Sequence, residues 1–152
     1  MPKMRRHDRE TGTEKAWEML EHADYMTLSM MGAEGVPYGV TLSFARVGES
    51  LYFHCASEGY KLDSLRQNPA VCITAVRQQR TKAEEFTVAF ESAVAFGKAF
   101  EVTEQAEKET GLLAICKKYA PENTGAAAYI AQYPQVSVWR IDVSDLSGKI
   151  HD

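Results

Sequence analysis

Residues 54–61, with the sequence HCASEGYK, combine a hydroxyl, a glycine and a lysine directly before a segment with helical character. The first turn of a helix attracts anions, because its N–H groups are unpaired and the helix dipole is positive there. Gly59 lets the backbone approach a ligand closely, Ser57 offers a hydroxyl and Lys61 adds a positive charge. The same residues also fit an ordinary strand–turn–helix connection with an N-cap serine and a solvated lysine. The residues alone leave both interpretations open.

His54 is the second candidate for chemistry in this segment. It alternates with Leu51, Phe53 and Cys55 in a strand-like pattern, so its side chain lies on the opposite face from theirs. A histidine in that position is either a catalytic candidate or a barrel residue whose hydrogen bonds are satisfied. The other three histidines are scattered along the chain, and neither a metal-ligand cluster nor a Ser/His/Asp arrangement stands out.

A helix and a second strand are expected to hold this segment in place. The helix begins near Tyr60, and Leu62 and Leu65 share one of its faces. It ends at Asn68-Pro69, because a residue before proline is disfavoured in the α region. Alternation over residues 71–76 then predicts the second strand.

Further alternating and helical patterns fill the rest of the chain. Thr11-Gly12-Thr13-Glu14 is a capping-box pattern with Thr11 as the N-cap, and Thr103 is expected to cap a second helix with Leu113 on its apolar stripe. Residues 78–85 are polar and of mixed charge, which predicts a loop. The expected helices cover residues 11–23, 103–119 and 126–132, and the expected strands cover 25–31, 36–44, 51–55, 71–76, 86–102 and 135–143.

The strand pattern at 36–44 has one face made only of small or weakly polar residues. Such a face suits solvent, or a flat ligand that lies close against the backbone. This pattern follows 25–31 through a glycine-flanked turn and precedes 51–55, so we expect three antiparallel strands in a row. Gly97, inside the long pattern 86–102, predicts a bulge or bend.

Composition limits the class of protein. The chain has 152 residues, a formal net charge of −4 and 45% hydrophobic residues, which is typical of one soluble domain with a real core. The charge gives no support for nucleic-acid binding, and no apolar run is long enough for a membrane span. The three cysteines are odd in number and widely spaced, which favours free thiols and a cytoplasmic location. We therefore expect a single domain over 1–152, with residues 1–10 as a charged arm that is mobile or docked on a partner.

Six strand patterns joined by short turns, with helices at the start, middle and late part of the chain, predict the fold class. This combination indicates a mainly β, α+β protein: a six-stranded antiparallel split β-barrel with covering helices.

Four runs of sequence resemble a known family. They are YFHCASEGYKLDSLRQNP, the preceding GVPYGVTLSF, the strand FESAVAFGKA and the closing VWRIDVSDLSGK. In this order they are similar to the flavin-binding split-barrel family related to pyridoxamine 5′-phosphate oxidase. The opening MRRHDRE also resembles the nitroimidazole-resistance branch of that family. The resemblance covers nearly the whole chain.

The resemblance implies a homodimer with two FMN molecules, each in a cleft between the subunits. The strand with His54 and the start of the following helix would hold the phosphate and ribityl chain. Residues 41–43, in the strand with the small-residue face, would lie along the isoalloxazine edge. The second subunit would contribute residues 91–92 and 139–140. This sequence departs from the family pattern at Thr41, a position at which a proline is common. In that order, the implied cofactor-binding residues are His54, Cys55, Ala56, Ser57, Gly59 and Lys61; Thr41, Leu42 and Ser43; and Glu91, Ser92, Trp139 and Arg140.

Three of these residues have an alternative role. Trp139 fits core packing as well as stacking on a ring. Arg140 could pair with Glu91 or another carboxylate instead of a cofactor. Glu91 is a carboxylate in a mostly apolar strand and needs a partner, for which a buried arginine is the usual solution.

Three functions compete at this stage. The first is an FMN-dependent oxidoreductase that takes electrons from a transiently bound reduced nicotinamide and reduces small electrophiles, nitroaromatics included, with His54 as the catalytic residue. The second is pyridoxamine-phosphate oxidation, for which the end of the chain offers only Lys149 and His151 as cations. The third is a flavin-binding or redox-sensing protein without turnover, because the same cleft would serve both binding and catalysis.

Overall fold

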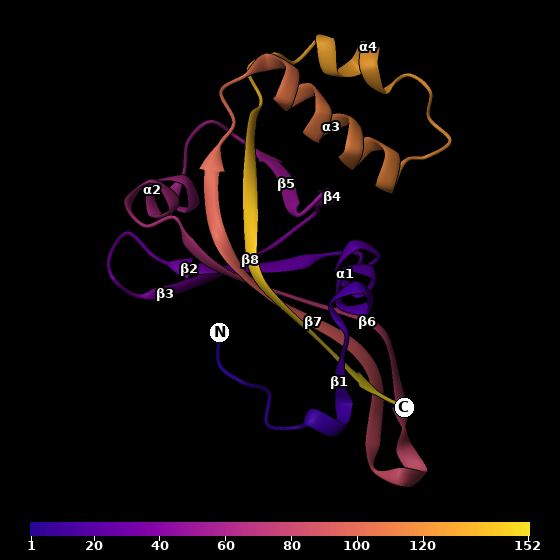
Figure 1. Cartoon of the computed structure of the whole chain (residues 1–152). Coiled ribbons are helices and arrows are strands. Elements are labelled where there is room, and N and C mark those ends of the chain that lie inside the picture. The colour runs from indigo at the N-terminus through magenta and orange to yellow at the C-terminus, as the bar shows by residue number, and fades with distance from the viewer.

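The computed structural model describes all residues, 1–152, and shows a mostly antiparallel β protein with α1 and α2 beside the sheet and α3 and α4 at one end of it (Figure 1). In chain order, the elements are η1 (His7–Arg9), β1 (Glu10–Thr11), α1 (Thr13–Glu21), β2 (Met26–Met31), β3 (Pro37–Leu42), β4 (Ala45–Val47), β5 (Ser50–Cys55), α2 (Tyr60–Gln67), β6 (Ala70–Lys82), η2 (Ala83–Glu85), β7 (Thr87–Glu101), α3 (Gln105–Tyr119), α4 (Ala126–Ala131) and β8 (Ser137–His151).

The strands form one sheet in the order β3-β2-β6-β7-β8-β5-β4, and β1 pairs with the outer part of β8. β3 and β4 lie at opposite ends of this order, yet only Ser43 and Phe44 separate them in the chain. With two residues between them, the end of β3 and the start of β4 can lie at most about 11 Å apart. The sheet therefore has to curl until its two edges nearly meet. The antiparallel split-barrel prediction is confirmed, with eight strands in place of six.

The prediction of three consecutive neighbouring strands is wrong. β3 pairs with β2 through the expected hairpin, but the second half of the pattern forms a separate strand, β4, which pairs with β5. The pattern 36–44 is therefore shared between the two edges of the curled sheet. Local alternation cannot reveal this division, because the period of two continues across the bend.

The main core lies inside the curled sheet and is closed at one end by α1. Ala16, Met19 and Leu20 of α1 are buried against it, as the helical periodicity predicts. α1 packs on β7 and β8, where small residues leave room for it: Ala93 is buried, and a side chain at Gly148 would lie 2.9 Å from Cβ of Ala16. This explains why the alanine face of β7, and not its bulky face, points inward.

The predicted N-caps are each one residue early. Thr11 belongs to β1 and pairs with Gly148, so α1 starts at Thr13 with Gly12 as its N-cap and no capping box forms. α3 likewise starts at Gln105 with Glu104 as its N-cap. On α3, Leu113 is 42% exposed and does not belong to the apolar stripe.

Residues 78–85 do not form a loop. β6 continues to Lys82, and η2 turns the chain into β7, which produces a long hairpin arm at the lower right of Figure 1. Gln78 sits at a bulge with a φ of 52°, between the paired residues Arg77 and Arg80. β8 also runs beyond the expected residue 143 to His151, and it pairs with β7 as far as Phe90, at the base of the arm. Polar side chains suit a two-stranded arm that has no core to face.

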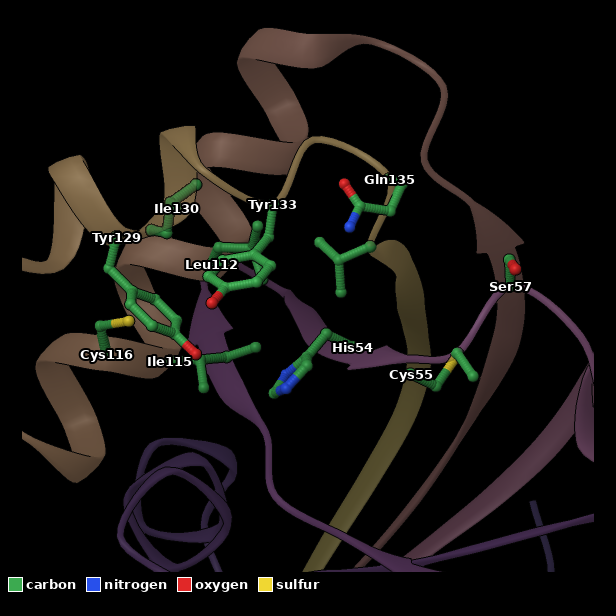
Figure 2. Close-up of a pocket in the computed structure, with 12 residues that line it drawn as sticks. His54, Cys55, Ser57, Leu112, Ile115, Cys116, Tyr129, Ile130, Tyr133 and Gln135 are labelled. Carbon is green, nitrogen blue, oxygen red and sulfur yellow. The ribbon is translucent and has the colours of Figure 1, made fainter.

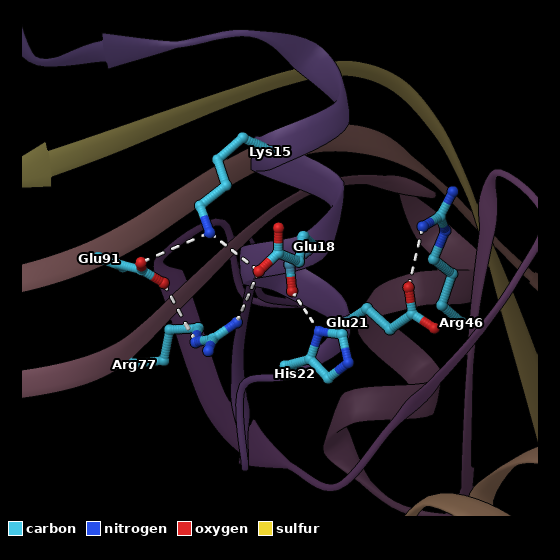
Figure 3. Close-up of polar contacts among 7 residues, drawn as sticks. All are labelled: Lys15, Glu18, Glu21, His22, Arg46, Arg77 and Glu91. Atoms are coloured by element: carbon cyan, nitrogen blue, oxygen red, sulfur yellow. Dashed lines mark hydrogen bonds and ion pairs between the residues drawn. The ribbon is translucent and has the colours of Figure 1, made fainter.

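An ion-pair network fastens the base of this arm to α1 (Figure 3). Glu91 receives the guanidinium of Arg77 at 3.1 Å and the ammonium of Lys15 at 3.7 Å, and Lys15 also contacts Glu18 at 2.9 Å. The side chains of Arg77 and Glu91 are only 19% and 13% exposed. A carboxylate so little exposed needs such partners. The arginine expected beside Glu91 is therefore Arg77, while Arg140 pairs with other carboxylates, Glu107 and Asp142.

No helix of the protein has both the length and the apolar character required to cross a membrane.

Gly97 is predicted to be required for the bend that shapes the sheet. The pairing of β7 with β8 shifts between Phe96 and Gly97, and a Cβ at Gly97 would overlap the carbonyl oxygen of Asp142. We expect Gly97→Ala to lower the free energy of unfolding by about 1–3 kcal/mol, because backbone atoms must shift to admit the methyl group. Urea denaturation measures the effect. Gly12→Ala is the matched control: its added Cβ meets nothing within 4 Å, and an equal loss in both variants would contradict the prediction.

Candidate functional site

A gap with unpaired backbone edges lies where the two ends of the sheet approach each other. β5 pairs with β8 over its full length, but with β4 only over residues 50–52, which leaves residues 53–55 without a strand partner on that side. β3 pairs with β2 alone, so Thr41 has an equally free edge. Continuing the β4–β5 register would set Ser43 opposite His54. Backbone donors and acceptors without a ladder partner are available to a ligand with its own polar edge.

The start of α2 lies directly after this gap and has the features of an anion site. Gly59 is its N-cap, with φ 135° and ψ 165°, a conformation that L residues other than glycine rarely adopt. The carbonyl of Gly59 accepts hydrogen bonds from the N–H groups of Leu62 and Asp63, while those of Tyr60 and Lys61 have no helical partner. Nothing lies within 4 Å of a Cβ built at Gly59, so the space before the helix is open.

Ser57 does not cap this helix. No side-chain hydrogen bond is made at the N-terminus of α2, and Ser57 is exposed. The alternative interpretation of Ser57 as the N-cap of an ordinary strand–turn–helix connection is therefore wrong. Its hydroxyl remains free for a ligand.

Lys61 is a half-buried cation without a carboxylate partner. Its ammonium lies 5.5 Å from the centre of the Phe53 ring and takes part in none of the ion pairs of the protein. The charge of Lys61 adds to the desolvation that lowers the pKa of His54, and it opposes in part the burial that raises the pKa of Cys55. An unneutralised ammonium beside free helix N–H groups is suited to bind a phosphate.

His54 lies between the gap and a cavity on the outer face of β5. Alternation along β5 sends Phe53 into the core and His54 to the opposite side, together with Tyr52. Desolvation, and then the charge of Lys61, hold the pKa of His54 below its ordinary value of 6.5. The imidazole is therefore neutral at pH 7, with one nitrogen that donates and one that accepts.

Cys55 has a protonated thiol. Burial raises the pKa of Cys55 above its ordinary value, and the opposing effect of Lys61 is smaller. Because the thiolate is the nucleophile, the site has no activated cysteine at this position.

The cavity has a volume of about 670 Å³ and separates the end of β5 from α3 and α4 (Figure 2). Nine of its twelve lining residues are hydrophobic. Figure 2 shows the rings of His54, Tyr129 and Tyr133 on different sides of this space. The lining residues are His54, Cys55, Ala56, Ser57, Leu112, Ile115, Cys116, Tyr129, Ile130, Tyr133, Gln135 and Val136.

The fold brings two groups of predicted site residues to the gap and places a third group far from it. Thr41, Leu42 and Ser43 flank the gap on one side, and the set His54, Cys55, Ala56, Ser57, Gly59 and Lys61 flanks it on the other. Glu91 and Ser92 are elsewhere: Ser92 pairs with Lys149 of β8, whereas His54 pairs with Val138. Val138 and Lys149 are eleven residues apart on β8, and eleven residues of extended strand cover about 36 Å. One chain therefore cannot bring Glu91 and Ser92 to the gap beside His54.

Trp139 has a packing role. It is 2% exposed, stacks on Phe53 with an interplanar angle of 13°, and donates its indole N–H to the Ser137 hydroxyl at 3.1 Å. No face of the ring is left for a flavin, so the structure corrects its assignment to cofactor binding.

Arg140 is fully engaged within the chain. Its guanidinium contacts Glu107 at 2.7 Å and Asp142 at 2.8 Å. Glu107 also accepts a hydrogen bond from the Tyr52 hydroxyl at 2.9 Å, and burial with this carboxylate raises the pKa of Tyr52 to about 12. This network ties α3 to the barrel, and the proposed cofactor contact of Arg140 has no support from its surroundings.

Sequence reasoning missed the cavity wall contributed by α3 and α4. Tyr129 and Tyr133 are four residues apart, and their ring centroids lie 4.9 Å from each other. That spacing is a weak signal for two rings on the same side of a short helix. Nothing local indicates that the pair faces His54.

A family model described as pyridoxamine 5′-phosphate oxidase matches residues 12–150. The chain belongs to this family. The resemblance found in its sequence is thereby confirmed. No curated protein sequence gives a match.

Solved structures share the fold. A candidate 5-nitroimidazole antibiotic resistance protein from Bacteroides thetaiotaomicron is 26% identical, with a TM-score of 0.76 over 91% of this chain and 84% of that protein. A FAD-binding protein from Mesorhizobium loti is 20% identical, with a TM-score of 0.72 over 95% and 98% of the two chains. A FAD- and heme-binding protein from Mycobacterium smegmatis is 16% identical, with a TM-score of 0.75 over 95% and 74%.

The charge of Lys61 predicts a coupled titration of His54. We expect the pKa of His54 to lie below 6.5 in the folded protein and to rise in Lys61→Ala, because a nearby positive charge disfavours the imidazolium. Titration of the imidazole resonances by NMR measures both values. An unchanged pKa in the variant would show that Lys61 does not act on His54.

The same shift has a consequence for stability. Between pH 6.5 and the lower folded-state pKa, the unfolded chain binds more protons at His54 than the folded chain does. The contribution of His54 to the free energy of unfolding therefore falls as the pH is lowered through this window.

Proposed function

We propose that this protein binds FMN at the gap between the sheet edges and acts as an oxidoreductase that reduces small electrophilic molecules with electrons from a reduced nicotinamide. The observation that carries the proposal is the position of Lys61, a lysine in none of the ion pairs, within the first turn of α2, whose N-terminus is open. The family membership and the flavin-binding proteins of similar structure support a flavin as the ligand.

The residues of the chain fit the parts of FMN in sequence along the gap. Lys61, the Ser57 hydroxyl and the free N–H groups of α2 would hold the phosphate. The unpaired backbone of residues 41–43 would face the polar edge of the isoalloxazine ring. Bound there, FMN would supply the transfer of hydride equivalents, while the protein binds and orients it.

His54 is the residue placed to act on the reacting molecules. Its neutral imidazole can donate one hydrogen bond and accept another at the boundary between gap and cavity. A neutral histidine can also hand a proton to a substrate from solvent. We assign His54 this role in the proposed reaction.

A second copy of the chain is part of the proposal. Ser92 lies about 36 Å of strand away from the His54 segment in one chain, so its expected contact with FMN requires the partner of a homodimer. Ser92 is half-buried on the outer face of β7, and its side chain is not taken up by the core. Glu91 is held by Arg77 and Lys15, and is therefore a weaker candidate for this contact.

Pyridoxamine-phosphate oxidation is less well supported. The two cations considered for its substrate phosphate, Lys149 and His151, belong to β8. The His151 ring bonds the carbonyl of Val88 at 2.7 Å, and Lys149 lies over the Phe90 ring. Both positions are remote from His54 along β8, so in the proposed homodimer they could serve only the gap of the other subunit, and both side chains already have contacts within their own chain.

The proposal predicts a yellow protein with reversible redox chemistry. After purification or incubation with FMN, we expect flavin absorption bands that bleach under nitrogen when a reduced nicotinamide is added and return with a nitroaromatic acceptor. Bands that do not bleach would support a flavin-binding or redox-sensing protein instead. A colourless protein that does not take up FMN would contradict the proposal.

A mixing experiment tests both Lys61 and the shared site. Lys61→Ala and Ser92→Trp are each expected to lower FMN retention by at least tenfold, because one removes the phosphate charge and the other blocks the partner's contact. Mixed after reversible dissociation, they should regain FMN in about a quarter of the sites, since half the dimers are mixed and each holds one intact site. Equilibrium dialysis with FMN measures retention.

The control for this experiment is Lys117→Ala, because Lys117 is an exposed lysine on α3 without an ion pair. It should retain FMN like the unmodified protein. Unchanged retention in Lys61→Ala would contradict the phosphate assignment, and the absence of complementation would contradict a site shared between subunits.

A further inference from the structure

The cavity between β5 and the α3–α4 pair is larger and more apolar than a flavin phosphate or a single-ring nitroaromatic requires. Its volume of about 670 Å³ falls within the range of sites that enclose drug-sized ligands. Filled with water, it would hold the equivalent of roughly 20 molecules at liquid density. Most of them would face apolar side chains, so a ligand that displaces them gains affinity.

We propose that this cavity, which adjoins the flavin gap and shares residues 54–57 with it, is a second binding site for an uncharged aromatic carbonyl compound with two fused rings. The proposal rests on the proposed function only in the role it gives this ligand, that of the molecule to be reduced. Binding itself does not depend on that role.

The shape of the lining favours a flat aromatic ligand. Leu112 and Ile115 of α3 and Ile130 of α4 provide apolar walls, and the rings of Tyr129 and Tyr133 stand at 45° to each other beside them. Aromatic rings that meet an aromatic ligand in tilted or offset arrangements add attraction beyond the buried area. Figure 2 shows these side chains around one common space.

The charge of the lining favours an uncharged ligand. No aspartate, glutamate, lysine or arginine borders the cavity. A charged group placed there would lose its hydration without gaining a counter-ion. The lowered pKa of His54 adds to this preference, because the imidazole is itself uncharged at neutral pH.

Polar groups at one end of the cavity favour a carbonyl. His54 and Gln135 both border the cavity near the end of β5, and each can donate a hydrogen bond to a carbonyl oxygen. Because Ser57 also borders this end, the carbonyl would lie on the side of the cavity that adjoins the flavin gap. A ligand held by its rings between the helices would thus present its carbonyl to His54.

A second cavity of about 490 Å³ adjoins the first and shares Cys116 and Tyr129 with it. The Tyr129 ring therefore belongs to a wall between the two spaces. Removing this ring should enlarge the site and lower its affinity for a compact two-ring ligand. Filling the space beside it from Cys116 should exclude the ligand altogether.

Binding can be measured with a neutral fluorescent naphthalene ketone, 6-propionyl-2-(dimethylamino)naphthalene, on the purified full chain with any flavin it retains. We expect saturable binding and displacement by 2-acetylnaphthalene. Acetophenone, with one ring, and naphthalene-2-sulfonate, with a charge, should each displace the probe at least tenfold less effectively, because they lose apolar contact or keep a buried charge unpaired.

Two variants locate the site. Cys116→Phe should weaken probe binding at least tenfold, and its matched control Leu113→Phe, on the exposed side of the same helix, should not. Tyr129→Ala also weakens binding, and because Tyr129 is 61% exposed it gives the decisive result if Cys116→Phe does not fold. In both cavity variants, FMN retention should equal that of the unmodified protein.

Three results would overturn the inference. The first is the absence of saturable probe binding to the unmodified protein. The second is equal displacement by the one-ring or the anionic compound. The third is loss of FMN together with the probe in Cys116→Phe, which would show that the cavity holds the flavin ring itself. Probe binding in a protein that takes up no FMN would support the cavity site while contradicting the proposed function, so the two failures are distinguishable.

Discussion

The two-residue connection between β3 and β4 is the constraint on which the rest of the structure depends. It joins the two edge strands of the sheet, and Phe44 within it is completely buried. The C-terminal end of α3 holds it in place: the hydroxyl of Tyr119 accepts a hydrogen bond from the Phe44 N–H at 3.2 Å and donates one to the Asp24 carbonyl at 2.6 Å. Lys118 adds its ammonium over the Phe44 ring at 3.7 Å, and burial lowers the pKa of this lysine to about 8.

The proposed site follows from this closure. Since the sheet edges are joined at one point and diverge beyond it, β3 and β5 keep backbone groups without ladder partners. The segment between β7 and β8 then forms α3 and α4, which cover the outer face of β5 and enclose the apolar cavity beside His54. A polar backbone gap and an apolar cavity thus adjoin each other along residues 54–57, an arrangement suited to a flat cofactor and a separate acceptor.

The distribution of ion pairs leaves a single cation at this place. Arg140 is held by Glu107 and Asp142, and Arg77 by Glu91 and by Glu18 of α1, so both guanidinium groups serve to fasten helices to the sheet. Lys61 has no such partner. Charges engaged in buried pairs contribute little to ligand binding, whereas an unpaired ammonium next to helix N–H groups retains its full attraction for an anion.

The sequence by itself determined the antiparallel β fold, the helix after Gly59, the bulge at Gly97 and the family, because each depends on local periodicity, turn chemistry or a contiguous motif. Only the tertiary structure decided which partners the long-range pairs find. It buried Trp139 against Phe53, gave Arg140 to Glu107, turned residues 78–85 into a hairpin arm and brought α4 to His54. These outcomes depend on packing contacts and ion pairs between segments that are far apart in the sequence. The spacing of residues along the chain does not show which of these segments will meet.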